Sequence, residues 1–330
     1  MSPGQVPLGH SAARVTRLVF GAAPIGGLFA PVTEAAARAT LEAAWAAGVR
    51  AFDTAPHYGA GLSERRLGGF LHGLPRPEFT VCTKVGRRLV PADGDVEGAY
   101  GFYGTPAMSR VQDFSRDGVL ASLEDSLGRL GLDRIDIALI HDPDEHTAQA
   151  LDEAYPALAD LRSAGVIRAV GVGMNEAGLL EWFVRRADLD CVMVAGRYTL
   201  LDTSAARTLF PECQRREVAV LAAGVFNSGV LASPGPDATY DYSAADHRIV
   251  ARARQMAAIC ARHGLPLGAA ALRFSLAHPA VTAVVVGARS PAEITQDASY
   301  LAEGLPDGLL SDLAAASLLP DGTPPEGTLP

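Results

Sequence analysis

The chain has 330 residues, of which 48% are hydrophobic and 20% charged, so it can bury a large core and its composition excludes intrinsic disorder. Its 28 Lys and Arg residues against 37 Asp and Glu residues give a net charge of −9, which argues against a nucleic-acid-binding surface and against a polybasic membrane anchor. Four scattered cysteines form no disulfide framework and no CxxC pair, as expected for a reducing compartment.

The apolar segment 19–32 follows two arginines and superficially resembles a secretory signal. Prolines and glycines interrupt it, so a buried strand followed by a loop is favoured. Nowhere does the sequence contain the roughly 18 consecutive apolar residues that a membrane span needs. We therefore expect a soluble, cytoplasmic protein that binds no membrane.

Short apolar runs alternate with longer segments of helical pattern along the chain. The runs predict strands at 16–21, 50–54, 79–85, 135–140, 169–173, 191–195, 219–223 and 283–286. Segments rich in alanine and leucine predict helices at 33–47, 63–71, 116–130, 148–164, 176–187, 203–216, 249–263 and 267–277. Thr33 is a predicted helix N-cap, and Ser290 with Glu293 forms a predicted capping box.

Strands that are apolar at nearly every position are covered on both faces, which indicates a parallel sheet. Eight alternating strand–helix units predict a (β/α)8 TIM barrel with long loops at its C-terminal face. The alternative is a doubly wound open sheet, but Pro24 interrupts the glycine-rich turn expected after its first strand. We expect a single domain over residues 1–330, with its core at about 15–305 and a C-terminal extension at 306–330.

Two segments, 87–114 and 224–246, are longer than a plain barrel requires. Long loops in compact domains are usually lids or binding loops, although an uninvolved surface excursion remains the alternative. The first segment contains the aromatic residues Tyr100, Phe102, Tyr103 and Phe114.

Polar residues stand at the ends of three consecutive predicted strands, where barrel enzymes place their chemistry. Asp53 and Lys84 lie in otherwise apolar strands and so need partners, and neighbouring strands bring them within reach of each other. Their pairing beside Tyr58 is expected to lower the pKa of the phenol. His141 completes a group suited to proton transfer at a carbonyl or hydroxyl carbon.

Each of these residues also has an ordinary structural explanation. Asp53 can cap a turn, Lys84 can extend to solvent, Tyr58 can pack in a core and His141 can be a loop residue. The segment 141–146 contains two histidines among acidic residues, but its spacing does not fit a metal site, and we expect no metal.

The motifs Phe-Asp-Thr-Ala-Pro-His-Tyr-Gly at 52–59, Ser-Glu-Arg-Arg-Leu-Gly at 63–68 and Gly-Val-Gly-Met-Asn at 171–175 together resemble the aldo-keto reductase superfamily. The segments 195–202 and 222–229 resemble its branch of L-fucose (D-threo-aldose) and pyridoxal dehydrogenases. The resemblance covers roughly residues 15–305. It implies a barrel, a nicotinamide cofactor across the C-terminal mouth, and a catalytic group of Asp53, Tyr58, Lys84 and His141, with Tyr58 as general acid and base.

The same resemblance implies the cofactor contacts. The expected cofactor-binding residues are Asn175, Phe226, Ser228, Gly229, Leu231, Gly287, Arg289, Glu293 and Asp297. NAD is favoured, with NADP possible, because members selective for NADP usually place a lysine and an arginine where Gly287 and Glu293 stand here. Ala195 and Ala223 replace the glutamine and the aromatic residue that many members place beside the nicotinamide ring.

The expected activity is oxidation of an aldose at C1 to a lactone, with a small sugar or aldehyde as substrate. The expected substrate contacts are His57, Tyr100, Phe102 and Tyr103, because aromatic faces pack on the C–H side of a sugar. A pyridoxal dehydrogenase, a general aldehyde reductase, a non-catalytic channel-type β-subunit and an unrelated barrel isomerase or aldolase are the alternatives.

Overall fold

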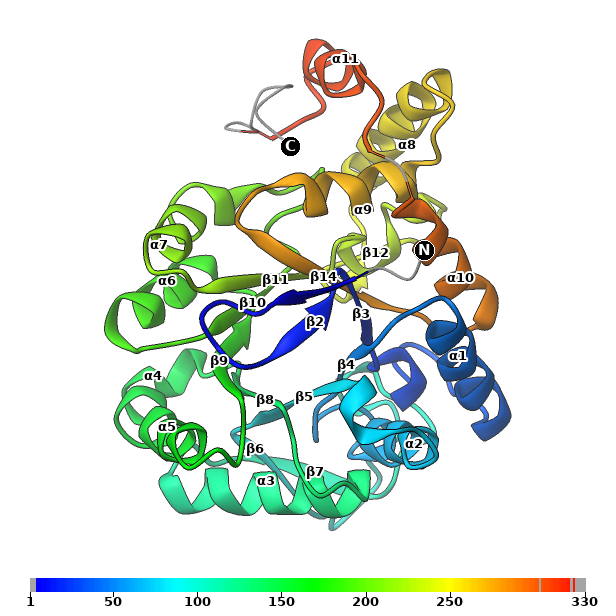
Figure 1. Ribbon diagram of the computed structural model, residues 1–330. Helices are drawn as coiled ribbons and strands as arrows, with labels where there is room; N and C mark the ends of the chain where they lie inside the picture. The colour runs from blue at the N-terminus through cyan, green and yellow to red at the C-terminus, as the bar shows by residue number, and fades with distance from the viewer. Residues whose placement is uncertain (1–3, 303, 321–322, 324–330) are drawn as a thin grey trace.

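The computed structural model describes residues 4–302, 304–320 and 323. In this part of the chain, eight parallel strands close into a barrel in the order β3, β4, β5, β8, β9, β10, β11, β14, and β14 pairs with β3 (Figure 1). Their bounds are β3 (Leu18–Gly21), β4 (Ala51–Asp53), β5 (Thr80–Val85), β8 (Ile137–His141), β9 (Ala169–Met174), β10 (Cys191–Ala195), β11 (Ala219–Ala223) and β14 (Val281–Gly287). The predicted barrel is confirmed, and the doubly wound alternative is wrong.

The barrel strands are buried on both faces, as their apolar composition predicts. Alternate strand residues such as Leu139, Met193 and Leu221 point inward and form one apolar cluster that fills the barrel. The residues between them, such as Ile140 and Val194, belong to the larger cluster shared with the surrounding helices. The barrel interior is therefore packed rather than open.

The helices surround the strands (Figure 1). They are α1 (Glu34–Ala46), α2 (Leu62–Leu71), α3 (Arg116–Leu130), α4 (Thr147–Gln149), α5 (Tyr155–Ser163), α6 (Ala177–Arg186), α7 (Leu209–Arg215), α8 (His247–Arg262), α9 (Leu267–Ala277), α10 (Pro291–Tyr300) and α11 (Leu309–Ala315). Thr33 caps α1 by accepting a hydrogen bond from the Ala36 N–H, and Ser290 caps α10. Both predicted N-caps are confirmed.

Two predicted helices differ from the structure because of prolines. The helix predicted at 148–164 contains a π-helical turn, Ala150–Ala154, before α5, since Pro156 has no N–H to donate to the preceding turn. The helix predicted at 203–216 is reduced to α7, because Pro211 fits the first turn of a helix, where its missing N–H leaves no bond unmade.

Three antiparallel hairpins were not predicted. They are β1 (Gln5–Pro7) with β2 (Arg14–Thr16), β6 (Arg87–Pro91) with β7 (Met108–Gln112), and β12 (Thr239–Tyr240) with β13 (Ser243–Ala244). The last two lie inside the predicted long loops. The predicted strand at 16–21 joins Thr16, the last residue of β2, to β3, although Arg17 separates the two strands.

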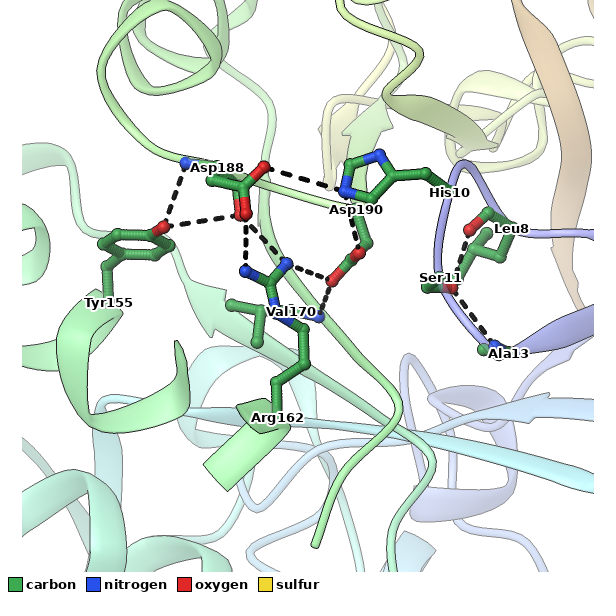
Figure 2. A network of polar contacts seen from close by, with 9 residues as sticks. All are labelled: Leu8, His10, Ser11, Ala13, Tyr155, Arg162, Val170, Asp188 and Asp190. Atoms are coloured by element: carbon green, nitrogen blue, oxygen red, sulfur yellow. Dashed lines mark hydrogen bonds and ion pairs between the residues drawn. The ribbon is translucent and has the colours of Figure 1, made fainter. Parts of the chain in front are cut away.

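The β1–β2 hairpin closes the N-terminal end of the barrel, which we call the floor. Leu8 and Ala13 from its turn are buried with the inward-facing strand residues. In the same turn, His10 lies 3.3 Å from a carboxylate oxygen of Asp190, which Arg162 also binds (Figure 2). The hairpin thus closes the floor of the barrel, and its turn contacts Asp190 through His10.

The C-terminal extension continues past α10 into α11, which packs against α8. Residues 303, 321–322 and 324–330 of the chain lie outside the described residues. Among the described helices, none is long and apolar enough to cross a bilayer.

Candidate active site

Lys84, Asp53 and Tyr58 meet at the C-terminal ends of β4 and β5, the mouth of the barrel. Lys84 Nζ donates to both carboxylate oxygens of Asp53, at 2.8 and 2.7 Å, and to the Thr54 carbonyl at 3.0 Å. The same ammonium lies 4.5 Å from the centre of the Tyr58 ring. Both charged side chains are only 2% exposed, and their pairing is what makes two buried charges tolerable at a strand end.

Burial and charge set the ionisation of this group. Burial acts to lower the pKa of Lys84, but the Asp53 carboxylate and neighbouring groups raise it overall, so the side chain stays an ammonium. Burial raises the pKa of Tyr58 above its ordinary value; Lys84 opposes this shift and Asp53 adds to it. The predicted lowering of the Tyr58 pKa is therefore wrong, because burial of the phenol outweighs the opposing effect of the Lys84 charge.

His141, at the end of β8, faces the edge of the Tyr58 ring, with ring centres 5.8 Å apart. Burial, with Lys84, Arg87 and His57, holds the pKa of His141 well below its usual range, so the imidazole is neutral. Its Nδ1 atom is buried with no hydrogen-bond partner within the described residues. The structure thus brings all four predicted catalytic residues together, with one hydrogen-bonding atom still unused.

The residues after Tyr58 hold the turn that presents it. Gly59 adopts φ +60°, and a Cβ there would lie 2.1 Å from the Gly26 carbonyl oxygen, so this close approach requires glycine. Ser63 bonds the Thr54 hydroxyl and donates to the Ala22 carbonyl, joining the loops after β3 and β4.

Glu64 links β5 to α3. Its carboxylate accepts hydrogen bonds from Thr83 of β5 at 2.8 Å and from Arg129 of α3 at 2.5 Å. Arg66 donates to the carbonyls of Ile25 and Val32, which fixes the loop after β3. Ser63, Glu64 and Arg66 of the 63–68 motif therefore stabilise the turn that contains Tyr58.

The predicted substrate residues occupy one side of the mouth. The Phe102 ring stacks beside Tyr58 at 6.2 Å and stands edge-on to His57 at 5.5 Å. Tyr100 is exposed, with its ring 5.2 Å from His57 and 5.0 Å from the Arg110 guanidinium. Tyr103 differs, because its ring lies against Gly98.

Phe114, the last aromatic residue of the segment 87–114, is fully buried. Its ring lies 5.3 Å from that of His146. Phe114 therefore packs in the hydrophobic core and supports the loop.

Three further side chains lie at the mouth and were not predicted as site residues from the sequence: Arg87, Asp142 and Tyr242. Arg87, at the start of β6, donates to the Asp142 carboxylate at 2.8 Å, and Asp142 follows His141 directly. Tyr242, at the tip of the β12–β13 hairpin, is 62% exposed, with its ring 6.3 Å from Phe29. Arg87 and Asp142 each come within three residues of a predicted catalytic residue, which is the signal that would have found them.

The expected cofactor residues lie on the other half of the mouth, in the loops after β9, β11 and β14. Asn175 follows β9, and the loop 224–231 contains the left-handed residues Asn227, Ser228 and Gly229 in succession. Asn227 Oδ1 is buried without a partner among the described residues, so this loop has an unused acceptor. A polar loop with an unused buried acceptor fits a nucleotide ligand.

Other residues of this loop have structural partners. Ser228 Oγ accepts from the Tyr242 N–H at 3.0 Å, and the Ser228 carbonyl accepts from Thr239, which ties the loop to the β12–β13 hairpin. Leu231 is fully buried and donates its N–H to the Phe226 carbonyl, and the Phe226 ring packs against the core. Contacts of Leu231 and Phe226 with a cofactor stay predictions.

The loop after β14 and the first turns of α10 are the third segment that contains expected cofactor-binding residues. A Cβ at Gly287 would lie 2.7 Å from Pro24, so no larger residue fits there without movement. The Glu293 carboxylate accepts from the Arg289 N–H at 2.9 Å. One turn further on, burial, with the nearby Glu293, raises the pKa of Asp297 to about 7.

The segment 141–146 does not gather its histidines. His141 faces Tyr58, whereas His146 bonds Gln112 and packs on Phe114. Within the described residues, no group of three or more His, Cys, Asp or Glu side chains is arranged to hold a metal ion.

Comparisons with known proteins agree with this geometry. Residues 17–317 match the model of the Aldo/keto reductase family. The chain is 45% identical to a D-threo-aldose 1-dehydrogenase from a Pseudomonas species (93% of this chain and 95% of that protein) and 39% identical to a pyridoxal 4-dehydrogenase from Microbacterium luteolum (94% and 97%). The structure of a glycerol dehydrogenase from Gluconobacter oxydans superposes with a TM-score of 0.79 at 24% identity, over 98% of this chain and 99% of that one, a likeness of fold.

Proposed function

This chain belongs to the aldo/keto reductase family, and from that premise we propose that it oxidises an aldose of the L-fucose or D-threo type at C1 to a lactone with NAD. Membership makes it an NAD(P)-dependent oxidoreductase acting on a small aldose or aldehyde. The observation that supports the finer proposal is the meeting of Asp53, Lys84, Tyr58 and His141 beside an aromatic wall, in a chain 45% identical to a dehydrogenase of D-threo-aldoses.

In this proposal Tyr58 moves the proton. Oxidation breaks the C1–H bond and the O–H bond of the anomeric hydroxyl; Tyr58 as phenolate accepts the proton, and C1 becomes the lactone carbonyl. A nicotinamide cofactor, which residues such as Asn175, Ser228 and Glu293 would hold, would supply the acceptor for the hydride. Lys84, held by Asp53, stabilises the phenolate, and the neutral His141 orients the substrate oxygen through a ring nitrogen. Because the pKa of Tyr58 is raised, the oxidation rate should increase with pH.

The preference for NAD rests on the start of α10. A 2′-phosphate needs positive charge and free donors, but Glu293 places a carboxylate there that already accepts the Arg289 N–H. The Glu293 N–H in turn donates to Ser290. A carboxylate can accept hydrogen bonds from the ribose diol of NAD, whereas it repels a phosphate.

The test is a panel of initial rates with L-fucose, D-arabinose, D-glucose and pyridoxal, each against NAD and NADP. We expect reduced cofactor to form with L-fucose and D-arabinose, with kcat/KM for NAD above that for NADP. Activity confined to pyridoxal would favour the alternative that the aromatic wall and the 39% identity to a pyridoxal 4-dehydrogenase support. A higher kcat/KM with NADP would overturn the cofactor preference.

A further inference from the structure

Arg87 and Asp142 form an ion pair at the mouth that the proton transfer does not use. Arg87 Nη2 donates to Asp142 Oδ2 at 2.8 Å. The two residues follow β5 and β8, which are neighbours in the barrel, so both lie beside the catalytic group. The pair therefore borders the space in front of Tyr58 and His141, where the proposed function places its substrate.

The pair touches the reacting side of the site directly. Asp142 Oδ2 lies 3.6 Å from His141 Nε2, and Arg87 Nη1 lies 3.5 Å from His57 Nδ1. Burial, Arg87 and other nearby cations lower the pKa of His57 to about 3, so this imidazole is neutral and its Nδ1 can accept from Arg87. Arg87 and Asp142 thus border the space around His141 and His57.

Both members keep hydrogen-bonding capacity beyond their mutual contact. Arg87 Nε is buried and has no partner among the described residues, and the Asp142 side chain remains 32% exposed. Asp142 also adopts φ +43°, a left-handed conformation held by its N–H bond to the Gly173 carbonyl. Backbone conformations of this kind are concentrated at active sites and ligand-binding loops.

We propose that Arg87 and Asp142 bind vicinal hydroxyl groups of the substrate next to the reacting carbon. A sugar hydroxyl both donates and accepts, so a diol is matched by a guanidinium, which only donates, beside a carboxylate, which only accepts. An aldehyde without these hydroxyls leaves the charged pair unsatisfied and is disfavoured. This inference rests on the proposed function and makes the pair the selector for polyhydroxy substrates.

The test compares glyceraldehyde with propanal in the reductive direction, using the better of NADH and NADPH. The variant is Asp142→Asn, because Asn keeps the shape of Asp and tolerates the left-handed conformation. Loss of a charged hydrogen bond should lower the ratio of kcat/KM for glyceraldehyde to that for propanal by about 10- to 100-fold. Arg87→Lys, which keeps the charge but loses the planar fork, should lower the same ratio.

The matched control is Asp160→Asn, which removes the same charge from the exposed Arg116–Asp160 pair on the outer helices and should leave the ratio unchanged. A ratio unchanged in both mouth variants would overturn the proposal. Equal loss with both aldehydes would also overturn it, because the pair would then only position His141 and His57. Failure of the wild-type protein to oxidise aldoses would instead contradict the proposed function, and the aldehyde ratio is measured independently of that activity.

Discussion

Each end of the barrel buries an aspartate at the end of a strand: Asp53 at the mouth and Asp190 at the floor. The two carboxylates differ in the hydrogen bonds of the groups around them. At the floor, Asp190 is 1% exposed and accepts from the Val170 N–H at 2.7 Å and from Arg162 at 2.8 Å, with His10 3.3 Å away (Figure 2). At the mouth, Asp53 is matched by Lys84, but the surrounding polar groups include atoms with no partner in the described residues, among them His141 Nδ1 and Arg87 Nε.

Backbone strain follows the same division. Most non-glycine residues with positive φ lie in loops at the mouth, namely Phe29, Ala60, Tyr100, Asp142, Asn227, Ser228, Asp241 and Tyr242. On the floor side, Glu217 precedes β11 with φ +58°. Positive φ is therefore concentrated at the mouth, the end where barrels bind their ligands, whereas buried atoms without a hydrogen-bond partner among the described residues also occur at the floor, for example Asp136 Oδ1.

The floor also has a shallow, open depression of about 450 Å³, bordered by His10, Arg162, Asp188 and Asp190. Its polar side chains already bind one another, and it lies opposite the end where barrels do their chemistry. The comparison therefore predicts that changes at the mouth alter rate and that changes here alter stability.

The largest expected effect is at the mouth, from Tyr58→Phe. Removing the phenolic oxygen abolishes proton transfer and should lower kcat about 10²–10⁴-fold without lowering the melting temperature. Steady-state kinetics and thermal unfolding measure the two quantities. Tyr155→Phe makes the same chemical change near the floor, where the hydroxyl bonds Asp188, and should leave kcat intact. Near-normal kcat in Tyr58→Phe would contradict the assignment.

The next effect is at the floor, from Asp190→Ala. The change leaves Arg162 and the Val170 N–H without their buried acceptor and should destabilise the protein by about 3 kcal/mol. Urea unfolding gives this value, and kcat of the folded fraction should match wild type. Asp188→Ala, at a neighbour 69% exposed, should cost less than about 1 kcal/mol. A large fall in kcat for Asp190→Ala would break the division between the two ends.

Asp297, on α10 at the mouth, is buried like Asp190 at the floor, with 7% of the residue exposed. Burial and Glu293 raise its pKa from 3.8 to about 7, so the native protein binds a proton that the unfolded chain releases between these values. This carboxylate therefore destabilises the fold as pH rises through 7.

Asp297→Asn should accordingly stabilise the protein at pH 8 by on the order of 1–3 kcal/mol, with the gain fading as pH falls toward 4. Urea unfolding of both proteins at pH 8 and pH 5 measures the change. An equal difference at the two pH values would show that the carboxylate charge is not the cause.

The smallest effect is expected from His10→Ala. Its side chain is 41% exposed, and Arg162 still holds Asp190, so the loss should be below about 1 kcal/mol. Thermal unfolding at neutral pH measures it. A loss as large as that of Asp190→Ala would mean that the hairpin, rather than Arg162, supplies most of the stabilisation at the floor.

Much of this molecule was predictable from local sequence. The eight strands follow from apolar runs. The end of β3 follows from its glycine, and the starts of α1 and α10 follow from the capping residues Thr33 and Ser290. Asp53, Lys84 and His141 were predictable as neighbours because consecutive parallel strands place their ends together. The short hairpins were not, since their strands lack the uninterrupted apolar runs that mark the strands of the barrel.

What the sequence determined by itself is therefore the barrel and the identity of its polar strand ends, because periodicity and burial are local properties. Only the tertiary structure decided how those groups interact: that burial outweighs Lys84 at Tyr58, that Phe114 is core, and that Arg87 meets Asp142. Ionisation and hydrogen bonding depend on distances between side chains 31 or 55 positions apart, such as Lys84 to Asp53 and Arg87 to Asp142, which no local pattern encodes.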